Sequence, residues 1–223
     1  MKKLALAIAT STALLAASTA AMAHQAGDIF VRGGPILVVP NTDTHNYNGG
    51  GYDFDVNSNA QLGLTGTYMV TDNIGVELLA ATPFSHEISL SVPALGAHLG
   101  PVAKTKHLPP SLYVQYYFLN ADSPARPYVG AGLNYTTFFN EKFNDTIHST
   151  LGVTPSDLKL KDSWGPAFNA GIDIKLTDKL FLNTAVWWAK IKTKATFKLG
   201  DAPQEARVTL DPTVFFVGLG YKF

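Results

Sequence analysis

Apolar and polar residues alternate with a period of two in eight segments of the chain. These segments cover residues 29–39, 62–70, 74–80, 112–118, 129–139, 168–176, 180–188 and 214–223. Alternation of this kind predicts β-strands with one apolar and one more polar face. Each segment is close to the length that a tilted strand needs to cross a bilayer. We therefore expect an all-β fold, an eight-stranded antiparallel transmembrane β-barrel of the outer-membrane type.

The connectors between these segments alternate in length. Short connectors comprise residues 71–73, 119–127 and 177–179, and long polar or glycine-rich connectors comprise residues 40–57, 88–107, 141–157 and 199–206. Outer-membrane barrels have short turns on the periplasmic side and long loops outside the cell. An even number of strands returns both termini to one side, so we expect both in the periplasm. We expect the long connectors to be extracellular loops.

The last segment ends the chain on an aromatic residue. Gly218, Tyr221 and Phe223 form the pattern Gly-x-x-Tyr-x-Phe, which resembles the terminal signal that barrel-assembly machinery recognises in bacterial outer-membrane proteins. Phe216 departs from that signal, which usually has a polar residue two positions before the glycine. A terminal aromatic residue also suits the interfacial girdle of a barrel. These residues predict the barrel-assembly machinery as a partner.

The first 23 residues have the pattern of a secretory signal peptide. Two lysines and an apolar stretch are followed by an A-x-A motif that ends at Ala23. Cleavage there leaves residues 24–223 as one domain. The sequence has no cysteine, so strands paired in a closed barrel must stabilise that domain without disulfides. Without the two lysines of the signal peptide, the domain has 15 basic and 17 acidic residues. This balance of charge gives no electrostatic footprint for nucleic acid.

Inward-facing residues about four positions from the short turns are polar. They are Arg32, Glu77, Gln115, Asp173 and Asn183. Isolated charges are costly in a narrow interior, but opposite charges that pair and hydrogen-bond can be held there. We expect a charge-balanced polar floor, which is either a structural stabiliser or a gated path for ions.

Further from the short turns, the inward-facing residues become apolar and aromatic. They are Ile36, Val38, Leu79, Tyr113, Phe138, Trp187, Val214 and Phe216. An eight-stranded barrel is just wide enough for side chains to fill it or for one small ligand. This layer is therefore either packed core or the lining of an apolar pocket. Polar interiors are the rule in such barrels, so the aromatic character favours the pocket.

Signals of catalysis and metal binding are weak. His148 and Ser149 are adjacent, so they would point to opposite faces of a strand. Four other histidines lack the close spacing of metal ligands; they are His45, His86, His98 and His107. No two carboxylates resemble a general acid and base at a cleft. We expect no enzymatic activity, no cofactor and no metal site.

Four runs of sequence carry a resemblance to a known family. They are residues 61–84 (QLGLTGTYMVTDNIGVELLAATPF), 107–110 (HLPP), 126–139 (RPYVGAGLNYTTFF) and 160–165 (LKDSWG). Together they resemble the OmpW family of bacterial outer-membrane proteins, and the resemblance covers essentially all of residues 24–223. It implies location in the outer membrane, an eight-stranded barrel with a narrow interior, and passage of small hydrophobic molecules. The sequence departs from the family mainly in residues 41–57 and 87–106.

Trp164 is the one position where the resemblance and the alternation disagree. Strict alternation places Trp164 on the lipid face, whereas a bulge at Gly165 and Pro166 would turn its side chain inward. The resemblance implies that the matching tryptophan belongs to the pocket. We therefore assign Trp164 to the pocket lining.

The expected function is uptake of small hydrophobic solutes through the pocket, with release sideways into the membrane. Proline donates no hydrogen bond to a strand ladder, and five prolines fall in the upper part of the segments; they are Pro35, Pro83, Pro109, Pro166 and Pro212. They loosen the wall or merely mark strand ends. Lys190, Lys192 and Lys194 face either outer-membrane lipopolysaccharide phosphates or solvent. The alternative function is a structural or surface-interaction barrel without transport.

Overall fold

Eight strands form a closed antiparallel barrel in the computed structural model, which describes residues 24–46, 51, 53–93 and 96–223. The wall comprises β1 (Ile29–Val39), β4 (Asn59–Met69), β5 (Ile74–Ala81), β8 (Ser111–Tyr117), β9 (Ala125–Phe143), β11 (Ser163–Lys175), β12 (Leu180–Ala189) and β15 (Thr213–Lys222). These strands pair in the order β11-β12-β15-β1-β4-β5-β8-β9, and β9 pairs with β11 to close the barrel. The predicted fold is confirmed, and the predicted signal peptide lies outside the described residues.

Side chains along the wall strands alternate between exposure on the outer surface and burial in the barrel interior. On β4, for example, Leu64 is 54% exposed whereas Thr65 is 1% exposed. The outward rows of the other strands are also apolar and include Val217 and Leu219 of β15. Such a continuous apolar belt is unsuited to water and matches the outer face of a membrane barrel.

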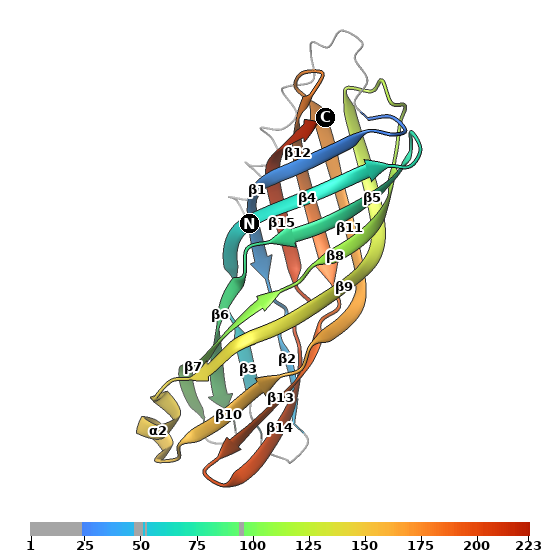
Figure 1. The fold of residues 1–223 in the computed structure, drawn as a ribbon. Coiled ribbons are helices and arrows are strands. Elements are labelled where there is room, and N and C mark those ends of the chain that lie inside the picture. The colour runs from blue at the N-terminus through green and yellow to red at the C-terminus, as the bar shows by residue number, and fades with distance from the viewer. Residues whose placement is uncertain (1–23, 47–50, 52, 94–95) are drawn as a thin grey trace.

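The described residues of the long connectors are folded into an extension of the barrel that consists mainly of further strands. The expectation that these connectors lie outside the cell stays a prediction. The extension comprises β2 (Asp43–Asn46), β3 (Asp53–Val56), β6 (Phe84–Val92), β7 (Ala97–Leu108), β10 (Pro155–Leu160), α2 (Thr146–Leu151), β13 (Lys192–Leu199) and β14 (Ala202–Thr209). Its hairpins β6–β7 and β13–β14 continue the barrel away from the C-terminus, toward the lower end of Figure 1. Strands form there because they cover a second apolar cluster that includes Leu90, Val102 and Ile147.

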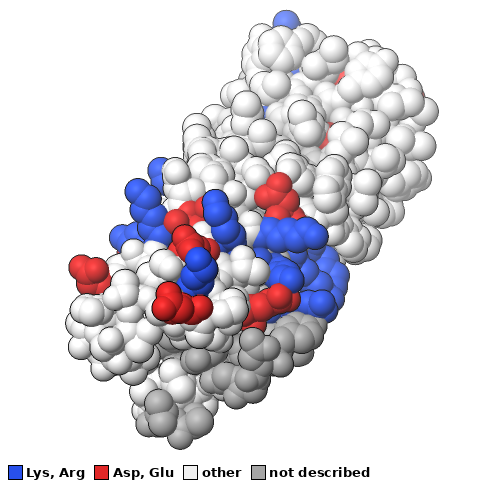
Figure 2. Space-filling view, turned by 60° about the horizontal axis from the view of Figure 1, so that its bottom comes forward, with Lys and Arg blue, Asp and Glu red and all other residues white. Residues whose placement is uncertain are grey.

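The extension carries most of the charged side chains visible in Figure 2, whereas the barrel wall in the same view has few. Ion pairs cross neighbouring strands there: Lys104 to Glu87 at 2.9 Å and Lys194 to Glu205 at 2.6 Å. The change from an apolar wall to a charged one marks the expected boundary between bilayer and water.

The short turns and both ends of the described chain meet at the other end of the barrel. Gly27 N donates to Met69 O at 2.8 Å, and Lys222 N donates to Lys179 O at 2.8 Å. Phe223 N donates to Ile29 O at 3.0 Å. The predicted return of the two ends to the short-turn side is therefore confirmed, while its assignment to the periplasm stays a prediction.

Candidate functional site

A buried arginine organises the polar floor of the barrel. Arg32 on β1 donates from Nε and Nη2 to the two carboxylate oxygens of Asp173 on β11, at 3.1 and 2.6 Å. Its Nη1 donates to Thr67 at 3.0 Å and also pairs with Glu77 on β5. All these side chains are buried. Arg32 therefore joins three parts of the wall across the barrel interior.

Two amides complete the predicted floor. Gln115 Nε2 donates to Glu77 Oε1 at 2.8 Å, and Asn183 Nδ2 donates to Asp173 Oδ1 at 2.7 Å. The structure thus brings together all five residues predicted for this layer. Charged groups held by several hydrogen bonds each can remain ionised inside a protein, because those bonds replace their hydration.

The prediction missed Tyr117 and Asn169, which belong to the same network. Tyr117 OH accepts from Arg32 Nη2 at 2.7 Å and donates to Gln115 Oε1 at 2.9 Å. Asn169 Nδ2 donates to Glu77 Oε1 at 3.2 Å. The signal was present, since Tyr117 lies two residues after Gln115 and so faces inward. Tyr117 was missed because the prediction assigned to the floor only inward-facing residues about four positions from the short turns.

His24 closes the floor although it precedes the first strand. Its Nε2 lies 2.9 Å from Asp173 Oδ2, and its ring stacks on Phe30 with centroids 4.1 Å apart. Arg126 Nη1 donates to the carbonyl oxygen of His24 at 2.7 Å. The first residue after the predicted cleavage site therefore plugs the barrel. Strand periodicity gives no signal for it, because it lies outside every strand.

A lower cavity of about 40 Å³ lies above the floor. Its lining contains six of the residues predicted for the pocket: Ile36, Val38, Leu79, Tyr113, Trp187 and Val214. They come from β1, β5, β8, β12 and β15, because inward positions at one height of a closed barrel converge. The layer is therefore not completely filled by side chains.

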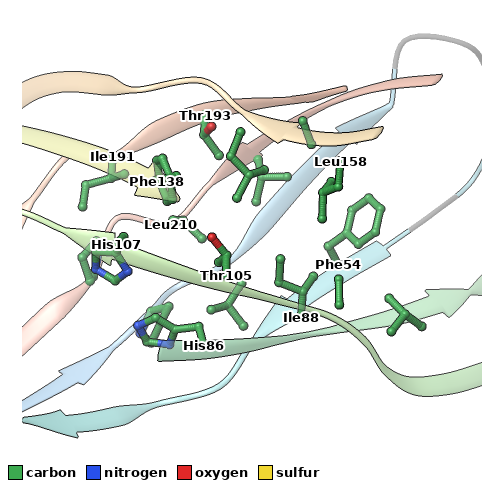
Figure 3. A pocket seen from close by; sticks show the side chains of 18 of the residues that line it. Phe54, His86, Ile88, Thr105, His107, Phe138, Leu158, Ile191, Thr193 and Leu210 are labelled. Carbon is green, nitrogen blue, oxygen red and sulfur yellow. The ribbon is translucent and has the colours of Figure 1, made fainter. Parts of the chain in front are cut away.

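A second cavity of about 60 Å³ lies further from the floor and continues into the extension. It is called the upper cavity because the floor is taken as the bottom of the barrel, although Figure 1 shows the molecule the other way up. Val38, His107, Ile191 and Pro212 line both cavities, so the two adjoin. Phe138, also predicted for the pocket, lines the upper one (Figure 3). A cavity of this size holds about two water molecules, so a larger solute requires side chains to move apart.

Phe216 is buried but lines neither cavity. Its ring packs against Trp187, with centroids 5.2 Å apart. A Cβ atom added to Gly218 would collide with the Phe216 ring, so this glycine leaves room for the ring beneath the lower cavity. Phe216 is packed core, which corrects its assignment to the pocket lining.

Trp164 lies on the outer surface, so its assignment to the pocket is wrong. Its side chain is 72% exposed and packs against the Tyr135 ring, with centroids 4.7 Å apart. The pairing of β11 with β9 runs without a register shift from Ser163 to Ile174. No bulge at Gly165 therefore reverses the alternation, and the lipid-side position follows.

Two stacked histidines lie where the cavities meet. The rings of His86 on β6 and His107 on β7 are 4.9 Å apart at an interplanar angle of 15°, and they lie side by side in Figure 3. His86 Nδ1 is 2.6 Å from the carbonyl oxygen of Asn57. Burial lowers the pKa of His107 to about 3, and the neighbouring His86 acts in the same direction. Both rings are therefore neutral near pH 7.

A seam in the wall borders the lower cavity. The ladder between β5 and β8 ends at the pair Leu79 and Ser111, and the ladder between β6 and β7 begins at the pair Phe84 and His107. Across this seam, residues 80–83 face residues 108–110 without ladder pairs. Pro83, Pro109 and Pro110 lack the N–H groups that such pairs require.

The residues of the predicted assembly signal lie on β15 and just after it. Tyr221 and Phe223 are exposed beside each other, with ring centroids 5.3 Å apart, whereas Gly218 faces inward. Their role in assembly stays a prediction. The amount of heat-modifiable barrel formed by a Phe223→Ala variant in the outer membrane would test it.

The apolar belt, the plugged floor and the apolar cavities define a small membrane β-barrel of the outer-membrane class. The OmpW family model matches residues 25–223. Outer membrane protein W of Vibrio cholerae is 54% identical over 213 residues, which cover 95% of this chain and 96% of that protein. The chain belongs to the OmpW family, and its place is the bacterial outer membrane.

Two further comparisons extend this result. The crystal structure of OprG from Pseudomonas aeruginosa superposes with a TM-score of 0.82 at 39% identity, covering 91% of this chain and 99% of that one. A more distant relative, the dibenzothiophene metabolism operon protein PahQ of Pseudomonas aeruginosa, is 28% identical over 172 residues, or 76% of this chain and 74% of that protein. The family and its structural neighbours are outer-membrane barrel proteins.

Proposed function

We propose that the barrel takes up small hydrophobic solutes through the upper and lower cavities and releases them sideways at the seam. The observation that carries this proposal is the apolar lining directly above a plugged floor. A solute that enters the lower cavity contacts Leu79 and Trp187. The name of PahQ, which refers to dibenzothiophene metabolism, supports an apolar solute.

The floor opposes passage straight through the barrel. Leaving an apolar cavity for a layer of paired charges exposes the solute at a cost of about 25 cal/mol per Å² of apolar surface, or several kcal/mol for a small aromatic molecule. Bilayer hydrocarbon offers the same solute an apolar medium. Lateral release is therefore the favourable route, and the seam is a stretch of wall beside the lower cavity that no ladder pair holds closed.

The seam lines the cavity from which release would occur. Ala81 and Phe84 on one side, and Pro109 and Ser111 on the other, all belong to the lining of the lower cavity. Ser111 Oγ donates to Pro109 O at 3.1 Å, which keeps Pro109 attached to the strand that follows it. Because no ladder pair joins residues 80–83 to residues 108–110, their separation connects the cavity with the bilayer without breaking a pair between them.

A reversible cross-link across the seam tests the route. Because the chain has no cysteine, cysteines at Ala81 and Pro109 can be joined by a thiol reagent that contains a cleavable disulfide. We expect cross-linking to abolish naphthalene uptake into cells and reduction to restore it. The matched control joins cysteines at Glu87 and Lys104, which already pair across β6 and β7, and should leave uptake unchanged.

Two single variants separate the solute route from an ion route. Leu79→Arg places a charge in the lower cavity and should abolish naphthalene uptake while the barrel still folds. Gln115→Gly opens the floor and should raise ion conductance without raising naphthalene uptake. Uptake that rises in step with conductance would show passage through the floor. Equal uptake by cells with and without the protein would favour the structural or surface-interaction alternative.

We also propose that outer-leaflet lipopolysaccharide binds an outer groove just above the apolar belt. Trp164, Lys161 and Lys192 line this groove together with Lys190 and Lys194. Lys190 and Lys194 have carboxylate partners, Asp211 at 3.3 Å and Glu205 at 2.6 Å. Among the described residues, Lys161 and Lys192 have no such ion pair. Tryptophan is typical of membrane interfaces, and lysines above it suit lipid phosphates.

Charge reversal tests the lipid partner. A variant with Lys161→Glu and Lys192→Glu should lower retention of lipid A during purification and weaken binding to vesicles that contain it. Charge reversal of Lys104, which lies on β7 and does not line the groove, is the control. If the groove variant retains lipid A as the wild type does, the lysines are merely solvated.

A further inference from the structure

The upper cavity contains a polar feature that apolar uptake does not use. His86 and His107 are the only titratable side chains that line it among the described residues. His107 also lines the lower cavity, so the pair lies at the junction through which a solute passes (Figure 3). Phe84 stacks on His107 with ring centroids 5.3 Å apart, which fixes the ring in place.

The hydrogen-bonding capacity of the two imidazoles is not filled by the protein. A carbonyl oxygen only accepts, so the contact with Asn57 O places the proton of neutral His86 on Nδ1 and leaves Nε2 as an acceptor. That buried Nε2 has no partner in the described part of the chain. For His107, likewise, the described residues supply no hydrogen bond to either ring nitrogen. Buried polar groups ordinarily have partners, so these atoms suit a ligand.

The cavity suits an uncharged ligand. Burial lowers the pKa of both histidines, and the hydrogen bond to Asn57 only partly opposes this for His86. No lysine, arginine, aspartate or glutamate of the described chain lines the upper cavity. A charged solute would therefore lose its hydration without gaining a partner of opposite charge.

We propose that His86 and His107 form a binding site for the hydroxyl group of an otherwise apolar solute, such as a phenol or an aliphatic alcohol. A hydroxyl group can donate to an imidazole nitrogen and accept from an imidazole N–H, so it can satisfy both kinds of group at once. A hydrocarbon leaves them unsatisfied. The inference rests on the proposed uptake function and names the solute class of the same route.

The test compares two probes of matched shape, naphthalene and 2-naphthol. Their binding to the full chain in lipid nanodiscs is measured for the wild type and for a variant with His86→Phe and His107→Phe, which keeps aromatic rings in both places. We expect naphthalene to bind equally to both proteins. We expect 2-naphthol to bind about tenfold more weakly to the variant, the loss typical of one hydrogen bond of ordinary strength.

Control variants keep the result interpretable. His98→Phe removes an imidazole on the exposed part of the extension and should change neither affinity. The single variant His86→Gln retains a hydrogen-bond acceptor and should keep part of the preference. It also provides a second measurement if the double variant does not fold into a heat-modifiable barrel.

The outcomes separate the two proposals. If both probes bind and the ratio of their affinities is the same in the wild type and in the double variant, the hydroxyl site is wrong while uptake stands. If neither probe binds the wild type, the uptake function is wrong and the hydroxyl site falls with it. A tenfold change confined to 2-naphthol supports the site.

Discussion

The floor and the cavities above it are both buried inside one barrel, yet they are built in opposite ways. In the floor, Arg32, Glu77 and Asp173 are tied together by charge-assisted hydrogen bonds from several strands. In the cavities, the lining consists mainly of apolar side chains, such as Leu79 and Phe138, which belong to one apolar cluster and make no directional bonds through their side chains. Directional bonds define one closed arrangement, whereas apolar contacts can rearrange around a solute.

The difference explains why the same scaffold can be closed at one height and adaptable at another. Removing one partner from a buried charged network leaves the others uncompensated, so the floor has few alternative states. Separating apolar side chains costs only the contact area that is lost, and a solute restores it. The predictions below test this contrast, from the largest expected effect to the smallest.

Loss of the central charge should have the largest effect. Arg32→Leu leaves Glu77 and Asp173 buried without their cation, so we expect the free energy of unfolding to fall by about 3–5 kcal/mol. Urea unfolding in detergent micelles measures it. Adding Glu77→Gln and Asp173→Asn to the same chain should recover most of the loss, because no uncompensated charge remains.

The loss of stability caused by a small change in the cavity lining provides a scale for the effect of Arg32→Leu. Ile36→Val removes one methylene group from the lining of the lower cavity, which typically costs about 0.5–1.5 kcal/mol. If Arg32→Leu were no more destabilising than Ile36→Val, the floor would not be the rigid part of the interior.

Acidification should lower the free energy of unfolding through protonation of His107, which lines both cavities. Its pKa is about 3 in the folded chain, below the value of about 6.5 expected after unfolding, so the unfolded chain binds the proton first. Stability is therefore full above pH 6.5 and falls as the pH drops toward 3. Between pH 7 and pH 4 we expect a loss on the order of 3 kcal/mol from this residue.

The variant His107→Phe isolates that contribution. It keeps a ring to stack on Phe84 but cannot take up a proton, so its stability should fall less than that of the wild type between pH 7 and pH 4. Unfolding free energies at the two pH values give the comparison. Parallel losses in both proteins would mean that His107 is not buried as a neutral ring.

Labelling of intact cells should show whether the extension or the floor end of the barrel faces the outside, and it does not depend on a change in stability. We expect the extension to face the outside, so a cysteine at exposed Asn144 should react with an impermeant thiol reagent. A cysteine at exposed Asp178, in a short turn at the floor end, should not react. The reverse pattern would place the floor outside and the cavities toward the periplasm.

Much of the barrel was predictable because alternation is a local property. Each wall strand contains most of a predicted segment, and Leu64 and Thr65 point to opposite sides as a period of two requires. The extension was not predicted, since β10 and β13 pair across a register shift and contain many polar residues. Their stability depends on partners that are distant in sequence.

Among the site residues, the sequence by itself determined which side chains face inward and at what height. Arg32 and Asp173, separated by 141 positions, could be assigned to one layer because strand direction and turn position set their heights. Trp164 supports the same conclusion. Strict alternation places its side chain correctly on the outer surface, whereas the family resemblance placed it in the pocket.

Only the tertiary structure decided which of these inward groups meet and where space remains between them. His24 reaches the floor from outside every strand, Phe216 folds into the room left by Gly218, and His86 stacks on His107. Alternation fixes the direction of a side chain, but a contact also depends on barrel closure, register and side-chain volume. These are properties of all the strands together, so no single segment of sequence contains them.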